Sequence, residues 1–280
     1  MAADPAQAGG VAPADPTARN PWALYDALIE GVPDGIVVTD ALVNRWAALR
    51  TDTGAVGLGM SYEAGPRSCP DDWAVRGRPL RDVARYAKSW DLRLASLGVA
   101  ALNAWYATPE RLDALAAAGH EVVRGRASNF FRRHAGILGV RKTAIVGHFP
   151  DVDDLTGDVT VLERRTRGND LPDPACEYVL PGCELVAITG STVVNKTLPR
   201  LLELAKDAEV HLVGPTAPPS LDAYPPCVVE FAGSVVVDPD ECWRLAGLGL
   251  RTIVESPALD MFSISLEPVR HPDVTKGSTT

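Results

Sequence analysis

Short apolar runs alternate with helical segments through the second half of the chain, and this alternation constrains the fold more than any other feature. Six runs have the length and composition of strands: 143–147, 159–163, 185–189, 209–214, 235–237 and 252–254. The segments 198–206 and 239–248 between them have the apolar spacing of helices. Runs that are apolar almost throughout are typical of parallel strands covered on both faces. We therefore expect an α/β protein with a Rossmann-like parallel sheet in this half.

The first half has a different order of elements. Residues 22–29 have helical spacing, and three segments then have the pattern of a strand meander: 35–39, 44–51 and 54–61. Two helices follow, one from Pro79 and one over 91–106, whose many Ala and Gly residues favour very close packing. Thr108 before Pro109 is typical of a further helix start. Strands first and helices after predict an α+β domain.

These patterns predict four regions. Residues 1–20 contain almost no large apolar side chain and are expected to be a disordered lead-in, and 271–280 a flexible tail. Residues 21–125 are expected to form the α+β domain, and 126–270 the Rossmann-like domain. The basic, partly aromatic stretch 121–138 is expected to connect the two domains; a solvated helix face is the alternative.

Composition excludes several classes of function. The net charge is −9 and basic residues are scattered, which argues against nucleic acid and anionic membranes as partners. No run of about 18 apolar residues exists, and the first residues lack a secretory pattern. The five cysteines form no CxxC pair, so we expect small buried residues in a reducing compartment. We expect a cytoplasmic protein with a small-molecule ligand; a homodimer is possible.

The turn 190–197 marks a ligand-binding position, because ligands of α/β proteins lie at the carboxyl ends of strands. It approaches the nucleotide P-loop pattern, but Asn195 stands where that loop needs its second glycine. Pro199 places the next helix start near Thr197 as N-cap. We expect a turn that binds an anion or polar ligand; capping and turn chemistry are the alternative. The predicted contacts are Gly190, Ser191, Thr192, Asn195, Lys196 and Thr197.

A second candidate lies where the first two strands of this domain end. Gly147 ends the first strand and Glu163 ends the second, a pattern that binds ribose hydroxyls in nucleotide and adenosyl sites. His148 is the best candidate histidine for acid–base chemistry, since its pKa lies near neutrality. His148 and Glu163 are also the candidate metal ligands, and a structural role for His148 remains an alternative. His211, inside a strand, is expected to be structural.

The remaining candidates come from other strand ends and from the first domain. Three strands deliver glycine to one edge of the predicted sheet. Asn103, polar in an apolar helix, must either find internal hydrogen bonds or face a ligand. We predict His148, Asn103 and Lys196 as catalytic residues. Further predicted ligand contacts are Gly147, Phe149, Glu163, Gly214, Pro215, Thr216, Ser61 and Tyr62.

Four stretches of the chain resemble one known family: 96–104, 146–150, 188–198 and 211–216. This is the family described as "putative heavy-metal chelation", which pairs an enolase-N-terminal-like domain with a Rossmann-like domain. The likeness spans about residues 20 to 265. It implies a site in the cleft between the domains and a role in metal chelation. The sequence departs from the family pattern at Lys196, where glycine is expected.

Two functions follow as hypotheses. The first is a small-molecule-binding protein that acts as an enzyme. Its interdomain cleft binds a chelated metal or a metal-binding small anionic ligand, as the resemblance implies. The second is a lyase or transferase that uses S-adenosylmethionine or a nucleotide on a small amino-acid-like molecule. A non-catalytic assembly module is a third alternative, and the cluster of polar turns argues against it. The cofactor is therefore expected to be a metal ion or an adenosyl ligand.

Overall fold

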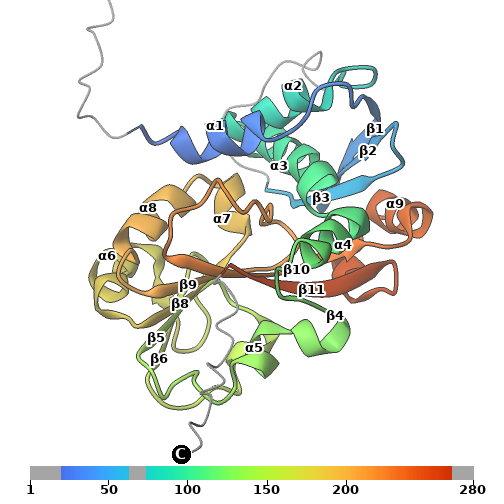
Figure 1. The fold of residues 1–280 in the computed structure, drawn as a ribbon. Coiled ribbons are helices and arrows are strands. Elements are labelled where there is room, and N and C mark those ends of the chain that lie inside the picture. Colours follow the sequence, from blue (N-terminus) through green and yellow to red (C-terminus); the bar gives the residue numbers. More distant parts are fainter. Residues whose placement is uncertain (1–19, 63–73, 267–280) are drawn as a thin grey trace, which may run out of the picture.

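The computed structural model describes residues 20–62 and 74–266, which form a mixed α/β structure with two sheets. A three-stranded sheet has the order β1-β2-β3, and an eight-stranded sheet has the order β4-β11-β10-β9-β8-β5-β6-β7. Figure 1 shows the smaller sheet and its helices seated on one side of the larger one. The predicted lead-in up to residue 19, the tail and Cys69 lie outside the described residues.

The first domain contains the predicted meander and helices. Its elements are α1 (Ala23–Glu30), β1 (Val38–Val43), β2 (Trp46–Thr51), β3 (Val56–Met60), α2 (Leu80–Ala84), the 3₁₀ helix η2 (Arg85–Lys88), α3 (Leu92–Tyr106) and α4 (Pro109–Ala117). Both strand pairs are antiparallel, as a meander requires. Thr108 accepts a hydrogen bond from the backbone N–H of Arg111 at the start of α4, so the predicted N-cap is confirmed.

The backbone of helix α3 lies directly against the backbone of β3, as the many small residues of the helix predict. A Cβ atom on Gly57 would lie 2.0 Å from the carbonyl oxygen of Ala100, and one on Gly59 would lie 2.4 Å from that of Ser96. The helix begins at Asp91, whose carboxylate accepts backbone hydrogen bonds from the first turn. Glycine in the strand thus permits the close approach.

The second domain holds the larger sheet. Its strands are β4 (Val122–Arg124), β5 (Thr143–Val146), β6 (Val159–Glu163), β7 (Leu171–Pro172), β8 (Leu185–Thr189), β9 (Glu209–Val213), β10 (Val228–Val236) and β11 (Leu259–Ser265). Its helices are η3 (Gly125–Ser128), α5 (Phe130–Arg133), η4 (Pro150–Val152), η5 (Asp173–Ala175), α6 (Cys176–Val179), η6 (Leu180–Gly182), α7 (Ser191–Val194), α8 (Leu198–Leu204), α9 (Pro239–Gly247) and η7 (Arg251–Glu255). The run from β10 through β9, β8, β5 and β6 to β7 is parallel, as predicted.

Two expectations about this sheet are wrong. The apolar trio 252–254 lies in η7, where Ile253 is fully buried, and the strand that follows it is β11. β11 runs antiparallel to β10, and β4 runs antiparallel to β11, so the sheet is mixed rather than parallel throughout. The predicted connector 121–138 contributes β4 to this sheet and α5 to one of its faces.

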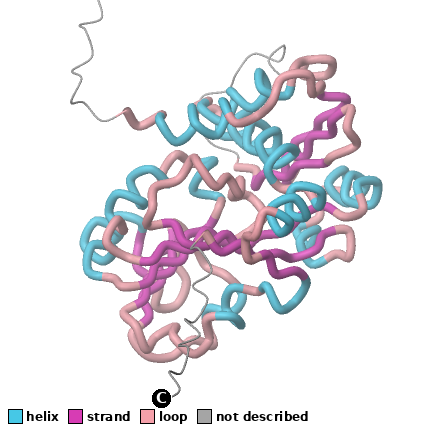
Figure 2. The backbone as a smooth tube through the Cα atoms, viewed as in Figure 1, coloured by secondary structure: helices cyan, strands magenta, loops and turns pink. Residues whose placement is uncertain are grey.

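Both faces of the large sheet are covered, as the apolar runs predict. Alternate strand residues pack toward α7 and α8 on one face, and toward α5 on the other; Figures 1 and 2 show these layers. The α7 face shares one continuous core with the first domain. The α5 face has a smaller core of its own, centred on Phe130, Phe131, Ile145, Ala187 and Val213. The two faces therefore differ in how much protein covers them.

The two domains are joined by direct contacts at several points. The hydroxyl of Tyr25 in α1 donates to the carbonyl oxygen of Val193 in α7, at 2.8 Å. The Nδ2 atom of Asn44 donates to the carbonyl oxygens of Ala246 and Gly247, at 3.2 and 3.0 Å. Apolar residues of β2 and β3 form a further core with α9.

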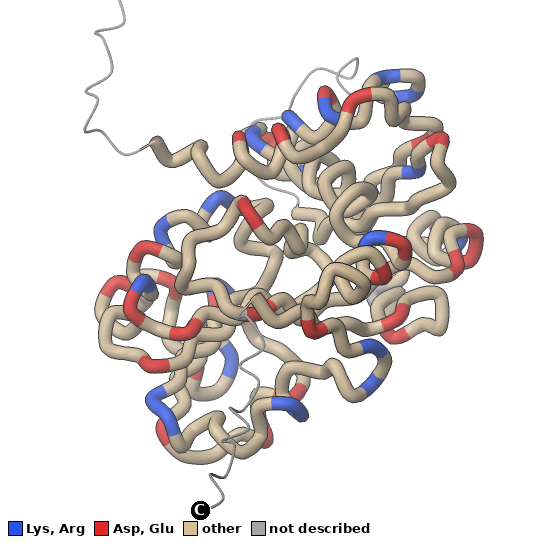
Figure 3. Tube along the Cα trace, in the orientation of Figure 1, with Lys and Arg blue, Asp and Glu red and all other residues tan. Residues whose placement is uncertain are grey.

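The positions of the charged residues and the cysteines match what the sequence predicts: scattered basic residues and small buried thiols. Figure 3 shows basic and acidic residues interspersed over both domains. Cys176, Cys183, Cys227 and Cys242 are free thiols; Cys227 is half-buried and the others are buried. Burial raises the pKa of Cys176 to about 11. Among residues 20–62 and 74–266, no helix combines the length and apolar character needed to cross a bilayer.

Candidate functional site at the carboxyl ends of the parallel strands

The predicted glycine turns lie side by side at one edge of the large sheet. Gly147, Gly190 and Gly214 directly follow or close β5, β8 and β9, which are neighbours in the sheet. The N–H of Gly190 donates to the carbonyl oxygen of Val213, at 2.8 Å, which ties two of these turns together. We define the carboxyl-end rim as residues 60–62, 147–149, 163–164, 189–192 and 214–216.

The three glycines serve different purposes. Gly147 and Gly214 have φ of 108° and 101°, a backbone conformation that favours glycine. Gly190 has an ordinary φ of −57°, but a Cβ atom there would lie 2.3 Å from the backbone nitrogen of Ala217. Close approach of two backbones, rather than backbone conformation, therefore requires Gly190.

His148 is held at the rim by a buried carboxylate. Its Nδ1 lies 3.0 and 3.2 Å from the two carboxylate oxygens of Asp170, whose side chain is 5% exposed. Its Nε2 is 3.5 Å from the Oδ1 of Asp153, an exposed side chain. A carboxylate on Nδ1 fixes the ring orientation and makes Nε2 a better proton acceptor or metal ligand. This geometry fits the predicted acid–base role.

Glu163 supports the backbone of His148 rather than its ring. One carboxylate oxygen accepts the N–H of His148 and the other accepts the N–H of Arg165, both at 3.0 Å. Both Glu163 oxygens are thus already engaged by backbone N–H groups. The pairing of His148 and Glu163 as metal ligands stays a prediction.

Tyr62 brings the first domain to the rim. Burial raises the pKa of Tyr62, while a hydrogen bond with Ser191 and the charge of Arg164 act to lower it. The Oγ of Ser191 lies 3.1 Å from the Oγ1 of Thr189, so hydroxyl groups form a chain across the domain boundary. Arg164 donates to Asp173 at 2.7 Å, which places a cation and an acid beside this chain. Ser191 and Tyr62, both predicted ligand contacts, thus lie together at the rim; their role in binding stays a prediction.

Several other predicted contacts serve turn chemistry. The Oγ1 of Thr192 donates to the carbonyl oxygen of Thr189 at 2.7 Å. The Oδ1 of Asn195 accepts hydrogen bonds from the N–H and the hydroxyl of Thr197, at 3.1 and 2.6 Å. Thr197 occupies the N-cap position of α8, as predicted, but its side chain makes no cap hydrogen bond. For Thr192, Asn195 and Thr197, the contacts match the capping alternative.

Asn103, Pro215 and Thr216 join the domains at the rim. The Nδ2 of Asn103 donates to the carbonyl oxygens of Leu58 and Pro215, at 2.8 and 3.1 Å. The N–H of Met60 donates to the Oγ1 of Thr216, at 3.1 Å. Asn103 thus uses both donors internally, and the domains are packed together at this point rather than separated by a cleft.

Ser61 and Phe149 complete the predicted set. The N–H of Ser61 donates to the carbonyl oxygen of Arg45 at 3.3 Å, which keeps it in the small sheet. The Phe149 ring lies 5.4 Å from the ring of Phe131 and packs with the α5-face core.

Comparison with known proteins identifies the family. Residues 131–261 match the DUF364 family model and residues 25–106 match the DUF4213 model, both described as "Putative heavy-metal chelation". A protein of unknown function from the DUF364 family of Desulfitobacterium hafniense is 32% identical, with a TM-score of 0.75 over 88% of this chain and 98% of that one. This chain belongs to the DUF364 family.

Two further relatives extend the comparison. A DUF364 protein of unknown function from Pyrococcus horikoshii has the same fold, with a TM-score of 0.67, 21% identity and coverage of 88% of this chain and 99% of that one. An uncharacterized protein of Methanocaldococcus jannaschii is 31% identical over 147 residues, which are 49% of this chain and 52% of that protein. The match to this curated relative therefore spans about half its length.

Lys196, where the resemblance led us to expect glycine, has a backbone conformation that favours glycine. Its φ is +68°, in the left-handed region that costs other residues about 1 kcal/mol or more. Its ammonium group donates to the carbonyl oxygen of Val194, at 2.7 Å, within its own turn. Burial lowers the pKa of Lys196 to about 7. An amine with a pKa near neutrality can act as a base. The hydrogen bond of Lys196 is made to Val194, however, and not to His148.

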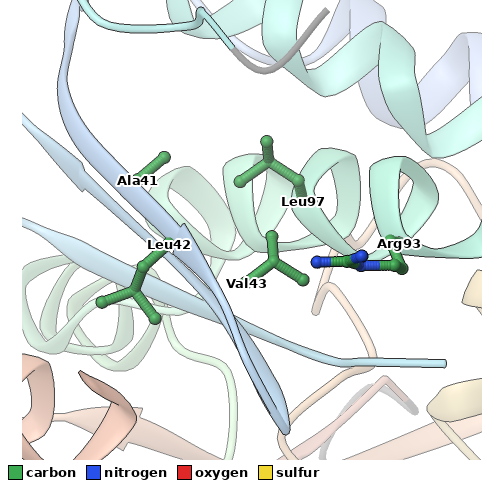
Figure 4. Close-up of a pocket in the computed structure, with 5 residues that line it drawn as sticks. All are labelled: Ala41, Leu42, Val43, Arg93 and Leu97. Carbon is green, nitrogen blue, oxygen red and sulfur yellow. The ribbon is translucent and has the colours of Figure 1, made fainter. Parts of the chain in front are cut away.

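Two cavities of this DUF364 protein lie away from the rim. One of ≈ 150 Å³ lies between β1 and α3, lined by Ala41, Leu42, Val43, Arg93 and Leu97 (Figure 4). Another of ≈ 410 Å³ lies at the opposite edge of the large sheet, near the amino ends of β8 and β9. Neither contains a predicted site residue.

Sequence analysis missed Arg164 at the rim and the two carboxylates that contact His148, Asp170 and Asp153. Asp170 follows His148 by 22 residues and lies just before the two-residue strand β7. A strand of two residues has no recognisable apolar pattern. The sequence therefore gives little indication that Asp170 is the carboxylate that orients His148. Arg164 directly follows the predicted Glu163, and its place after a strand end could have indicated it.

Proposed function

We propose that this DUF364 protein binds a small anionic metal chelator, or its metal complex, at the carboxyl-end rim and acts on it as an enzyme. The observation that carries the proposal is that Tyr62 and Ser191, from two domains, meet at the carboxyl end of β8, next in the sheet to the strand that precedes His148, the partner of Asp170. The family description as heavy-metal chelation supports the ligand class.

Each group has a defined task in this proposal. His148 exchanges a proton with the ligand through Nε2, or coordinates the ligand's metal through the same atom, while Asp170 holds Nδ1. Tyr62 and Ser191 offer hydroxyl hydrogen bonds to anionic oxygens, and the half-exposed Arg164 offers positive charge. Imidazole suits zinc, copper, iron and nickel, which are the metals such a chelate would carry.

An adenosyl cofactor is the alternative ligand. In that binding mode, the acid after the second strand accepts ribose hydroxyls. Here the Glu163 carboxylate accepts two backbone hydrogen bonds, which leaves it less available for a ribose. We therefore favour the metal chelate over S-adenosylmethionine or a nucleotide.

Ligand-induced thermal stabilisation tests the proposal. We expect the nickel–citrate complex to raise the Tm by about 5 °C at a concentration near 100 times its Kd, because a ligand that binds only the folded state stabilises it by about 2.7 kcal/mol there. We expect His148→Ala to abolish this rise and Tyr62→Phe to reduce it. Citrate alone, S-adenosylmethionine and ADP are measured in parallel.

Matched variants decide where the complex binds. His120→Ala, which removes a histidine far from the rim in the fold, is expected to keep the full rise, as is His134→Ala. A rise that persists in His148→Ala would place the complex elsewhere. A rise with S-adenosylmethionine and none with nickel–citrate would favour the adenosyl alternative.

A further inference from the structure

Two histidines and a glutamate meet on the α5 face of the large sheet, outside the rim. His211 in β9 and Glu230 in β10 are register partners, and both side chains point toward α5. His134 follows directly after α5. The Oε2 of Glu230 lies 2.6 Å from the Nε2 of His134 and 2.8 Å from the Nδ1 of His211.

The cluster is enclosed and held in place. The side chains of His211 and Glu230 are 4% and 5% exposed, and that of His134 is 18% exposed, which leaves a path from solvent. Phe130 covers both imidazole rings, with ring centroids 4.8 and 5.1 Å away. The Nε of Arg133 donates to the second oxygen of Glu230 at 3.1 Å, which orients the carboxylate.

Two buried polar atoms on this face lack a hydrogen-bond partner among the described residues. They are the Nε2 of His211 and the Oγ of Ser263. Ser263 in β11 is the register partner of Ala232, two residues from Glu230, so it faces the same side of the sheet. Buried polar atoms are normally hydrogen-bonded, so these two atoms need partners, such as ordered water molecules, beyond the described side chains.

We propose that His134, His211 and Glu230 form a binding site for a divalent transition-metal ion of the zinc class. One ligand atom from each residue can be chosen so that all lie within 4.8 Å of one another. Two imidazoles and one carboxylate form a set that holds zinc with a fourth position open to water. A tetrahedral zinc needs ligand atoms about 3.4 Å apart. The contacts of Glu230 with His134 and His211 must therefore each lengthen by less than about 1 Å; His134, at the end of its helix, can supply the first change, and rotation of the Glu230 carboxylate the second.

The charge of the surroundings fits a dication. Arg133 bridges Glu230 and Glu121, with its Nη2 3.3 Å from the Oε1 of Glu121. With neutral imidazoles, these three side chains carry one net negative charge. A dication bound at these nitrogens would leave each neutral imidazole with its proton on the other ring nitrogen, and the net negative charge of the three side chains would partly balance the charge of the ion.

Cobalt(II) titration of the metal-free, full-length protein tests this site. We expect one equivalent of cobalt to bind with visible ligand-field absorption, and zinc to displace it. His134→Ala is expected to weaken binding by more than the roughly 10- to 100-fold loss typical of changes beside a metal ligand. His134→Cys is expected to restore binding with a new thiolate-to-cobalt absorption band, which a purely structural role would not produce.

Control variants separate this site from the rim. His120→Ala is expected to bind cobalt like the wild type, and circular dichroism checks that each variant is folded. Folded wild-type protein that binds no cobalt would overturn the proposal, as would unchanged binding by His134→Ala. Loss of cobalt in His148→Ala alone would move the metal to the rim. The proposal does not depend on the rim function, since nickel–citrate binding and cobalt binding are tested by different variants.

Discussion

Gly190→Ala is expected to lower the free energy of unfolding by about 3 kcal/mol and to abolish ligand binding at the rim. The new Cβ would lie 2.3 Å from the backbone nitrogen and 2.9 Å from the Cα of Ala217. Both are backbone atoms, so the clash can be relieved only by moving the turns after β8 and β9 apart. Because φ at Gly190 is −57°, alanine brings no backbone strain, and the loss measures packing alone. Urea denaturation followed by circular dichroism gives the free energy.

Gly136→Ala is the matched control. A Cβ atom at this position would meet no atom within 4 Å. We expect its stability to stay within about 0.5 kcal/mol of the wild type. Equal stability of the Gly190 and Gly136 variants would show that the rim turns are not packed as described.

Lys196→Met is expected to raise the free energy of unfolding at pH 7 by about 2 kcal/mol. Burial lowers the pKa of Lys196 from 10.5 to about 7. The folded state therefore binds a proton at Lys196 more weakly than the unfolded chain does. A fall of that size corresponds to about 4 kcal/mol at pH 7 as an upper bound, and partial exposure of the side chain reduces it. Methionine keeps the length and the backbone conformation while removing the charge.

The pH dependence of stability gives the sign of this effect. Between pH 7 and about 10, the unfolded state holds more protons at Lys196 than the folded state, so the contribution of Lys196 to stability should rise with pH, and the gap between Lys196→Met and the wild type should narrow. The methionine variant should lose this rise, and Lys206→Met at an exposed position should keep it. A Lys196→Met protein less stable than the wild type at pH 7 would contradict the account.

The architecture could be predicted where local sequence carries the signal. The apolar runs that became β5, β6, β8 and β9 are bounded by glycine or charge, and their ranges agree with the structure to within one residue. The error at 252–254 has a physical reason. Thr252, Ile253 and Val254 are all β-branched and favour a strand locally. Burial of Ile253 against α9 stabilises a 3₁₀ helix instead. Tertiary contacts decided that segment.

The candidate sites depended on contacts that the sequence does not encode locally. Glycine, His148 and Ser191 were predictable because each follows a strand end. Asp170, which orients His148, belongs to a loop 22 residues away. His134, His211 and Glu230 are spread over nearly 100 residues, and alternation within β9 concealed that His211 faces α5 rather than the larger core.

The most direct test of the rim assignment is anomalous X-ray diffraction from crystals grown with excess nickel–citrate. We expect an anomalous nickel peak at coordination distance from the Nε2 of His148, with citrate oxygens near Tyr62 and Ser191. Well-ordered crystals with nickel only beside His134, His211 and Glu230, or with none at the rim, would contradict it.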